Sequence, residues 1–332
     1  MGLFAAAKLA KAGFSPIVHE AHSQIGVPEH CTGLVSNNID QLAEPEVVLH
    51  YINGARFFFK KNETLLEKKK VAKVIDRVEF EKQLFDDARS SGAKVKLTSK
   101  VSYRDFSGQI IASDGAFGST RTDFNQKLKF LPAIQFDLKE KPNYNFVELH
   151  FVDWNPDYFI WVVPRGNYVR VGTASKNLLP LKAFIRKRFG RFNPAKKYAG
   201  LVVTSGPVKQ TYFKEPNREV FLVGDSAGQV KPTTGGGLVT GLTCVDILSK
   251  QISNGTPQNY DRAWREKLGR EFQMQKLAAW MMNRNPNGFI NLLRKARVKL
   301  ETKGDMDFQI RGLMRFLPYL PSFLLGAVFS RR

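Results

Sequence analysis

The sequence has 332 residues, enough for a two-domain globular enzyme with sizeable hydrophobic cores, and nothing in it is repeated or of low complexity. Two cysteines, Cys31 and Cys244, exclude a disulfide framework and a four-thiolate cluster, so any iron–sulfur electron donor must be a separate protein. A net charge of +21 favours a partner that is dense in phosphate, either nucleic acid or anionic lipid.

The basic residues lie in short, scattered runs. The runs are Lys68–Lys70, Arg186–Arg188, Lys196–Lys197 and Arg294–Arg297. No zinc-finger spacing or RNA-binding aromatic motif accompanies them, so we favour an anionic membrane surface over nucleic acid. A solvated basic surface without a partner is the alternative. No secretory signal is visible, and we expect a cytoplasmic protein that is peripheral on the inner face of the membrane.

The chain begins with an alanine-rich helical pattern that ends at Gly13, followed by a strand over Pro16–Glu20. This pair matches the second half of a dinucleotide-binding unit, in which a glycine starts the helix and an acidic residue about 20 positions on binds the ribose hydroxyls. Gly2 and Glu20 fit these places. The strand and two glycines that normally precede have no counterpart, so we expect them to be encoded upstream of Met1. An ordinary helix–strand pair would give the same spacing.

The next elements alternate between strand and helix. Val71–Ile75 predicts a weak strand, and Asp76–Ala88 predicts an amphipathic helix with an acidic N-cap. Lys94–Leu97 is the next expected strand. Ile110–Gly115 follows and ends in an Asp-Gly turn that begins at Asp114.

From residue 131 the pattern changes to alternating, aromatic-rich strands. They are expected at Ala133–Phe136, Phe146–Phe151, Phe159–Val163 and Tyr168–Val171. This alternation predicts an antiparallel sheet that forms the wall of a second domain.

Residues 219–238 carry the strongest signal in the chain. Val220–Val223 predicts a short buried parallel strand that stops at Gly224-Asp225, where a carboxylate can accept hydrogen bonds from sugar-like hydroxyls. Gly235–Gly237 then lead into a helix, and their lack of side chains lets backbone N–H groups approach an anion or a polar ring edge. A tight turn with a solvated Asp225 is the alternative.

The C-terminal region is predicted to be helical after a boundary at Asn254–Pro257. Cys244 has helical spacing typical of a core residue, and Tyr260–Met282 predicts a long amphipathic helix. The uncharged apolar stretch from Phe316 to Ser330 is too short and too broken by prolines to span a bilayer but can lie on one. The tail from Leu313 to Phe329 would supply apolar anchors there. The basic residues that would assist it are Arg294, Lys295, Arg297 and Lys299.

The order Gly224-Asp225, Gly228, Pro232, Gly235–Gly237 resembles the second flavin motif of the geranylgeranyl reductase family, and Asp114-Gly115 is similar to its middle motif. The resemblance covers nearly the whole chain, although the hairpin before the middle motif is shortened. It implies a Rossmann-like α/β fold that binds FAD, with an inserted antiparallel sheet and a helical C-terminal region. The implied domains are 1–130 and 216–256 for FAD, 131–215 for the substrate-side sheet, and 257–332 for the C-terminal helices.

The same resemblance implies the site residues. Those expected to bind FAD are Gly2, Glu20, Cys31, Thr32, Leu34, Arg77, Val101, Asp114, Gly224, Asp225, Gly236, Gly237 and Leu238. Cys31 is also the candidate catalytic residue, because the family has a similar thiol beside the flavin. Trp161 and Pro164 match the family's substrate-side motif. Two other positions of the motif differ, because this chain has Phe159 and Val163 where the family has Tyr and Phe. Trp161 would flank an isoprenoid chain.

The implied function is the FAD-dependent reduction of double bonds in geranylgeranyl chains of archaeal-type membrane glycerophospholipids. Reduced flavin would deliver hydride to one alkene carbon, and an acid would protonate the other. The electron donor would be external: reduced nicotinamide, ferredoxin or another carrier. No metal site is expected. A related flavin monooxygenase and an inactive lipid-binding relative are the alternatives.

Overall fold

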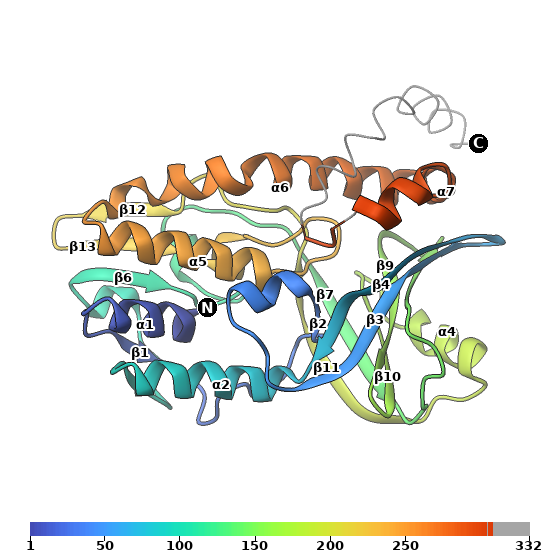
Figure 1. The fold of residues 1–332 in the computed structure, drawn as a ribbon, viewed down its shortest axis with the longest axis horizontal. Helices are drawn as coiled ribbons and strands as arrows, with labels where there is room; N and C mark the ends of the chain where they lie inside the picture. The colour runs from blue at the N-terminus through green and yellow to red at the C-terminus, as the bar shows by residue number, and fades with distance from the viewer. Residues whose placement is uncertain (304, 308–332) are drawn as a thin grey trace.

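Figure 1 shows the computed structural model, which describes residues 1–303 and 305–307. Stacked helices and short strands form one part, and a large curved sheet forms the other. The helices are α1 (Gly2–Lys11), α2 (Arg77–Ser90), α3 (Thr120–Asp123), α4 (Pro180–Phe189), α5 (Leu238–Ser253), α6 (Tyr260–Arg284) and α7 (Pro286–Lys303). Short 3-10 turns are η1 (Asn37–Gln41), η2 (Tyr103–Asp105), η3 (Gly224–Ala227) and η4 (Pro257–Asn259). The predicted C-terminal helices are thus present as α6 and α7, whereas the predicted tail lies outside the described residues.

Two small sheets form the dinucleotide-binding part. β1 (Ile17–His19) pairs in parallel with β5 (Lys94–Lys96). β6 (Gly108–Ala112) pairs in parallel with β13 (Arg218–Leu222), whose other edge carries antiparallel β12 (Tyr212–Glu215). No strand among the described residues joins β1 to β6.

The predicted strands and the Asp-Gly turn of this part are present at nearly the expected positions. Between β5 and β6 the described chain forms only the short turn η2, which confirms that the hairpin expected there is shortened. β13 ends two residues before Gly224-Asp225 enters the turn η3. Helix α5 then begins at Leu238, directly after the glycine run.

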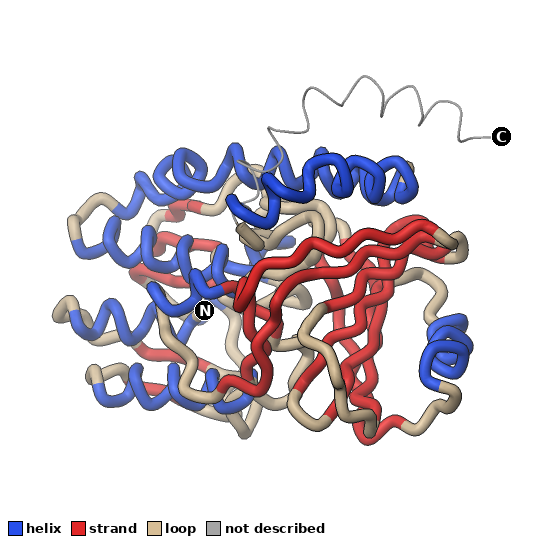
Figure 2. The backbone as a smooth tube through the Cα atoms, turned by 45° about the vertical axis from the view of Figure 1, so that its right-hand side comes forward, coloured by secondary structure: helices blue, strands red, loops and turns tan. Residues whose placement is uncertain are grey.

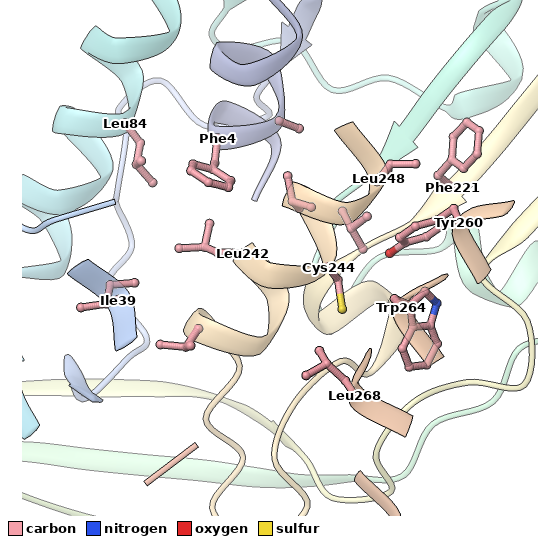
Figure 3. Close-up of a cluster of buried hydrophobic side chains, with 14 of the residues drawn as sticks. Phe4, Ile39, Leu84, Phe221, Leu242, Cys244, Leu248, Tyr260, Trp264 and Leu268 are labelled. Carbon is pink, nitrogen blue, oxygen red and sulfur yellow. The ribbon is translucent and has the colours of Figure 1, made fainter. Parts of the chain in front are cut away.

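The helices of this part share one hydrophobic core, part of which is drawn in Figure 3. Phe4 of α1, Leu84 of α2, Leu242 of α5 and Trp264 of α6 contribute to it. Cys244 is fully buried in the same core, which confirms its predicted packing role. Burial raises the pKa of the Cys244 thiol well above its usual value, so this cysteine is chemically inert.

Helix α2 begins where the sequence predicts, because Asp76 caps it. The Asp76 carboxylate accepts hydrogen bonds from the backbone N–H groups of Val78 and Glu79, at 3.0 and 3.2 Å. We expect Asp76→Ala to lower the free energy of unfolding by about 1 kcal/mol, because both donors lose their partner. Chemical denaturation would measure this loss. Asp87→Ala, on the exposed surface of the same helix, is the control, and an equal loss in both variants would contradict the capping role.

An eight-stranded sheet forms the other part, in the order β11-β7-β10-β9-β8-β3-β4-β2. Its strands are β2 (Leu34–Ser36), β3 (Val48–Phe59), β4 (Asn62–Ile75), β7 (Phe130–Leu138), β8 (Val147–Val152), β9 (Asn155–Arg165), β10 (Tyr168–Ala174) and β11 (Pro194–Val203). The four strands predicted after residue 131 are confirmed as β7 to β10. These strands pair antiparallel with one another, as expected. β3, which comes from an earlier part of the chain, joins the same sheet by pairing in parallel with β8.

The long hairpin β3–β4 is the main element that the sequence analysis missed. The strand predicted at Val71–Ile75 is only the last part of β4. Both strands are partly exposed along most of their length. Their sequences do not show the regular apolar alternation that predicts a half-buried strand. The sheet is therefore built from two separate stretches of the chain.

The two faces of the large sheet have different partners (Figure 2). On one face, Leu181 and Ile185 of α4 pack against Ile160 and Val171. On the other face, the side chains turn toward α7 and toward the dinucleotide-binding part. The second face borders the cavity described next.

Candidate functional site

A cavity of about 1740 Å³ lies between the two parts. This volume exceeds the roughly 300–1,000 Å³ of common small-molecule pockets, so it suits a dinucleotide together with an elongated substrate. Gly2 and Asp225 line it from the dinucleotide-binding part, Trp161 and Leu149 from the large sheet, and Phe289 from α7.

Most of the predicted site residues line this one cavity. They are Gly2, Glu20, Cys31, Thr32, Leu34, Arg77, Val101, Asp114, Trp161, Asp225, Gly236, Gly237 and Leu238. Their predicted contacts with FAD and with the isoprenoid chain stay predictions.

Gly224 and Pro164 do not line the cavity. Gly224 has a φ of +65°, and a Cβ there would lie 2.8 Å from Cγ of Met1, so this glycine allows a close backbone approach. Pro164 follows Val163, which does line the cavity, and successive residues of a strand point to opposite faces of the sheet. The predicted substrate contact of Pro164 is therefore not supported by its position.

Asp225 is a hydrogen-bond acceptor that has no donor among the described residues. Its carboxylate lines the cavity at the start of η3, and the structure gives it no hydrogen bond within the described part of the chain. Burial raises its pKa, and the positive charges of the N-terminal amino group of Met1 and of Arg77 partly offset this effect. Asp225 is half-buried, so a carboxylate that faces the cavity without protein donors is suited to accept hydrogen bonds from ligand hydroxyls.

Arg77 is the complementary group. It occupies the first turn of α2 and lines the same cavity. Its Nη2 pairs with Glu81, whereas Nε and Nη1 are buried without a hydrogen-bond partner in the described part of the chain. Unsatisfied guanidinium donors favour phosphate or hydroxyl oxygens.

The glycine run Gly235–Gly237 leaves bare backbone at the cavity wall. A Cβ at Gly237 would lie 2.6 Å from Cγ1 of Val230 and 3.0 Å from Oδ1 of Asp225. Side chains are therefore excluded next to the carboxylate. Asp225, Arg77 and this run together fit FAD, because they offer an acceptor for hydroxyls, donors for phosphates and a flat surface for a ring.

Two of the predicted carboxylates already have internal partners. Oε1 of Glu20 accepts a hydrogen bond from the backbone N–H of His22 at 2.9 Å. Oδ2 of Asp114 accepts one from the backbone N–H of Thr120 at 3.1 Å, at the start of α3. Asp114 therefore orders its own loop as well as lining the cavity.

Cys31 lies on the loop that connects the two parts of the molecule. Its side chain is exposed, and its Sγ accepts a hydrogen bond from the backbone N–H of Gly33 at 3.4 Å. Gly33 has a φ of +79°, and a Cβ there would meet the carbonyl oxygen of Ile75, so only glycine suits this turn. Thr32 and Leu34 line the cavity beside the thiol.

An apolar wall forms the rest of the cavity. The Trp161 indole lies across Gly172 on the neighbouring strand, where a Cβ would lie 2.5 Å from its Cζ2. Tyr158 contacts Trp161 edge to face, with ring centroids 6.2 Å apart. The sequence analysis missed the other side of this wall, formed by Phe57, Leu66, Phe289 and Leu293. The spacing of Phe289 and Leu293 on one face of α7 was a signal that could have revealed it.

Comparison with known proteins agrees with the fold and the resemblance. No family model matches the chain. It is 28% identical over 317 residues to the digeranylgeranylglycerophospholipid reductase of Methanocaldococcus jannaschii, covering 80% of each chain. Among solved structures it resembles a geranylgeranyl bacteriochlorophyll reductase-like protein of Thermoplasma acidophilum, with TM-score 0.80 and 19% identity, covering 98% of this chain and 95% of that one. It also resembles a flavin-dependent brominase, with TM-score 0.70 and 13% identity, covering 98% and 96%.

These likenesses confirm the predicted fold and the predicted resemblance to geranylgeranyl reductases. The α/β part with its inserted curved sheet and C-terminal helices is shared with a reductase-like protein and with a flavin-dependent brominase, whose names indicate different reactions. The fold alone does not determine which of those reactions a chain catalyses, because the reaction depends on the site that the fold carries.

Proposed function

We propose that this chain is an FAD-dependent reductase of the double bonds in geranylgeranyl chains. The observation that carries the proposal is one cavity with two chemically different ends. Asp225 and Arg77 lie at the polar end, and Trp161 lies in the apolar wall. A relative named for the reduction of digeranylgeranylglycerophospholipids supports the same substrate class.

Bound FAD, once reduced by an external donor, would supply the hydride equivalent for this reaction. Asp225 would accept hydrogen bonds from the hydroxyls of its sugar-like chain, and Arg77 would neutralise its phosphates. The backbone of Gly235–Gly237 would lie along the ring. The wall around Trp161 would hold the apolar chain and exclude water.

Cys31 is the residue that we propose for the protonation step. Its thiol lies on the loop between the two ends of the cavity, and no hydrogen bond from another side chain holds it within the described part of the chain. Addition of a hydride to one alkene carbon and of a proton to the other saturates the bond. The thiolate that remains would regain its proton from solvent.

Spectroscopy of the reconstituted protein tests the proposal. Under anaerobic conditions, protein with chemically reduced FAD should regain the spectrum of oxidised flavin when a geranylgeranyl lipid is added. The fully saturated lipid is the control and should leave the flavin reduced. Reoxidation that requires oxygen, with a hydroxylated product, would favour the monooxygenase instead. A protein that binds lipid but no flavin would favour the inactive relative.

We further propose that the chain docks on an anionic membrane surface near the hairpin β3–β4 and α7. Within the described residues no helix is long and apolar enough to cross a membrane. Glu67 of β4 and Glu301 of α7 line the cavity, and the backbone N–H of Glu67 donates to Oε1 of Glu301 at 2.8 Å. Glu67 is also exposed, so the cavity reaches the surface here. Exposed Lys61 and Lys69 lie on the same hairpin.

Vesicle binding tests this docking surface. Replacing Lys61, Lys69 and Arg284 by glutamine removes three exposed charges from this side of the molecule. At roughly 1 kcal/mol per basic residue near an anionic surface, we expect binding to weaken by about 3 kcal/mol.

The measurement is co-sedimentation with anionic vesicles at low salt, and added salt should weaken binding of the parent protein. The matched control replaces Lys11, Lys94 and Lys214, which are exposed residues of the dinucleotide-binding part. Equal losses in the two variants, or equal binding to neutral vesicles, would contradict a localised docking surface.

A further inference from the structure

Arg170 is a fully buried charge in the middle of the large sheet. Its Nε and Nη2 donate to the two carboxylate oxygens of Asp137 on the neighbouring strand, at 2.6 and 2.8 Å. Burial by itself would lower the pKa of Arg170, but hydrogen bonds to Asp137 and Glu29 raise it instead. The guanidinium therefore stays charged, and two of its three nitrogens are hydrogen-bonded to Asp137 within the sheet.

The third guanidinium nitrogen of Arg170 binds the loop that carries the Cys31 thiol instead of a strand of the sheet. Nη1 donates to the carbonyl oxygen of Cys31 at 2.6 Å and to Oε1 of Glu29 at 2.8 Å. The residue between them is also tied to the sheet, because Nε2 of Gln135 donates to the carbonyl oxygen of His30 at 3.1 Å. Three consecutive loop residues are thus fixed to strands β7 and β10.

Stability alone does not account for this arrangement. A buried ion pair contributes little net stability compared with apolar side chains that fill the same volume. The planar guanidinium of Arg170 binds a carboxylate with two nitrogens and a backbone carbonyl with the third. Neither an apolar side chain nor a lysine offers this combination of contacts. The bound carbonyl belongs to the residue that bears the exposed thiol.

We propose that Arg170 is a positioning residue that fixes the Cys31 thiol relative to the apolar wall. Gly172 is two residues from Arg170 on the same face of β10 and lies beneath Trp161. The same strand therefore supports both the thiol loop and the indole. Loss of the contact to Cys31 would leave the cavity intact but let the loop move. The proposal rests on the proposed function of Cys31.

The variant Arg170→Lys tests this role, because lysine keeps the charge and loses the planar guanidinium. We expect FAD affinity to stay at the parent value, and kcat to fall by about a hundredfold, as a displacement of about 1 Å in a reacting group can cause. Alkylation of Cys31 by iodoacetamide, followed by mass spectrometry, should become several-fold faster. Cys244 should stay unmodified as an internal standard, since it is fully buried.

The matched control is Arg188→Lys. Arg188 lies on α4 and pairs with Glu148 of β8 in the large sheet, at 2.9 Å. It does not touch the thiol loop. We expect its kcat and its Cys31 alkylation rate to match the parent. If Arg170→Lys fails to fold, Glu29→Ala removes one acceptor of Nη1 at the loop itself and should also speed alkylation.

A lower Tm in Arg170→Lys, with kcat and Cys31 alkylation both unchanged, would overturn the proposal and leave only a structural role. Failure of the proposed function would look different, because the parent protein would then lack flavin or turnover. The alkylation rates of parent and variant would still report whether Arg170 holds the loop.

Discussion

Asp225→Asn is expected to yield protein that does not retain FAD through gel filtration. The Asp225 carboxylate lines the cavity and lacks donors among the described residues, so hydroxyls of the ligand would be its partners. A hydrogen bond to a charged group contributes about 1.5–3 kcal/mol, so losing one weakens binding roughly ten- to hundredfold. The readout is visible absorbance per protein after gel filtration.

The matched control for this variant is Asp246→Asn. Asp246 lies on α5 and forms surface ion pairs with Lys8 and Lys250, at 2.6 and 2.8 Å, so its loss should have little effect on FAD. Asp225→Asn with the full visible absorbance of the parent would contradict the role assigned to this carboxylate.

The largest expected effect on stability follows from Asp137→Leu. Among the described residues, this change leaves buried Arg170 with Glu29 as its carboxylate partner. It also removes the acceptor of the Tyr198 hydroxyl, which donates to Oδ2 of Asp137 at 2.9 Å. Breaking a buried pair by removing one partner costs about 3–5 kcal/mol. Chemical denaturation would measure the free energy of unfolding. The double variant Asp137→Leu/Arg170→Met should lose less, and equal losses in the single and double variants would contradict this account.

The same pair gives a dependence of stability on pH. Burial would raise the pKa of Asp137, but the hydrogen bonds from Arg170 and Tyr198 and the charge of Arg165 outweigh it, so the folded pKa lies below the usual value. Its contribution is present in full above the pKa of the unfolded chain. The contribution is lost as the pH falls through the lowered pKa of the folded state.

The sequence predicted the parts of the site that depend on local structure. The turn at Gly224-Asp225 and the glycine run before α5 follow from strand, turn and helix signals within 20 residues, and all are present. The start of α2 was predicted for the same reason, because Asp76 caps the helix that it precedes. The thiol loop and Trp161 were predicted from the resemblance to the geranylgeranyl reductase family.

The parts that could not be predicted depend on contacts between distant residues. Arg170 holds the carbonyl of Cys31 across 139 positions of sequence, and nothing near either residue indicates the pairing. The parallel pairing of β3 with β8 also joins segments that are far apart in the sequence. Pro164 does not line the cavity, because the face of a strand that borders a cavity is set by how the sheet packs, which the alternation along β9 does not reveal.

One measurement tests the central claim most directly: the mass of a geranylgeranyl lipid after anaerobic incubation with the protein and chemically reduced FAD. We predict that the lipid gains a pair of hydrogens for each double bond reduced. We also predict that the gain disappears when Asp225→Asn replaces the parent protein. A lipid recovered with its mass unchanged, from a protein that has bound FAD, would contradict the assignment as a reductase of geranylgeranyl chains.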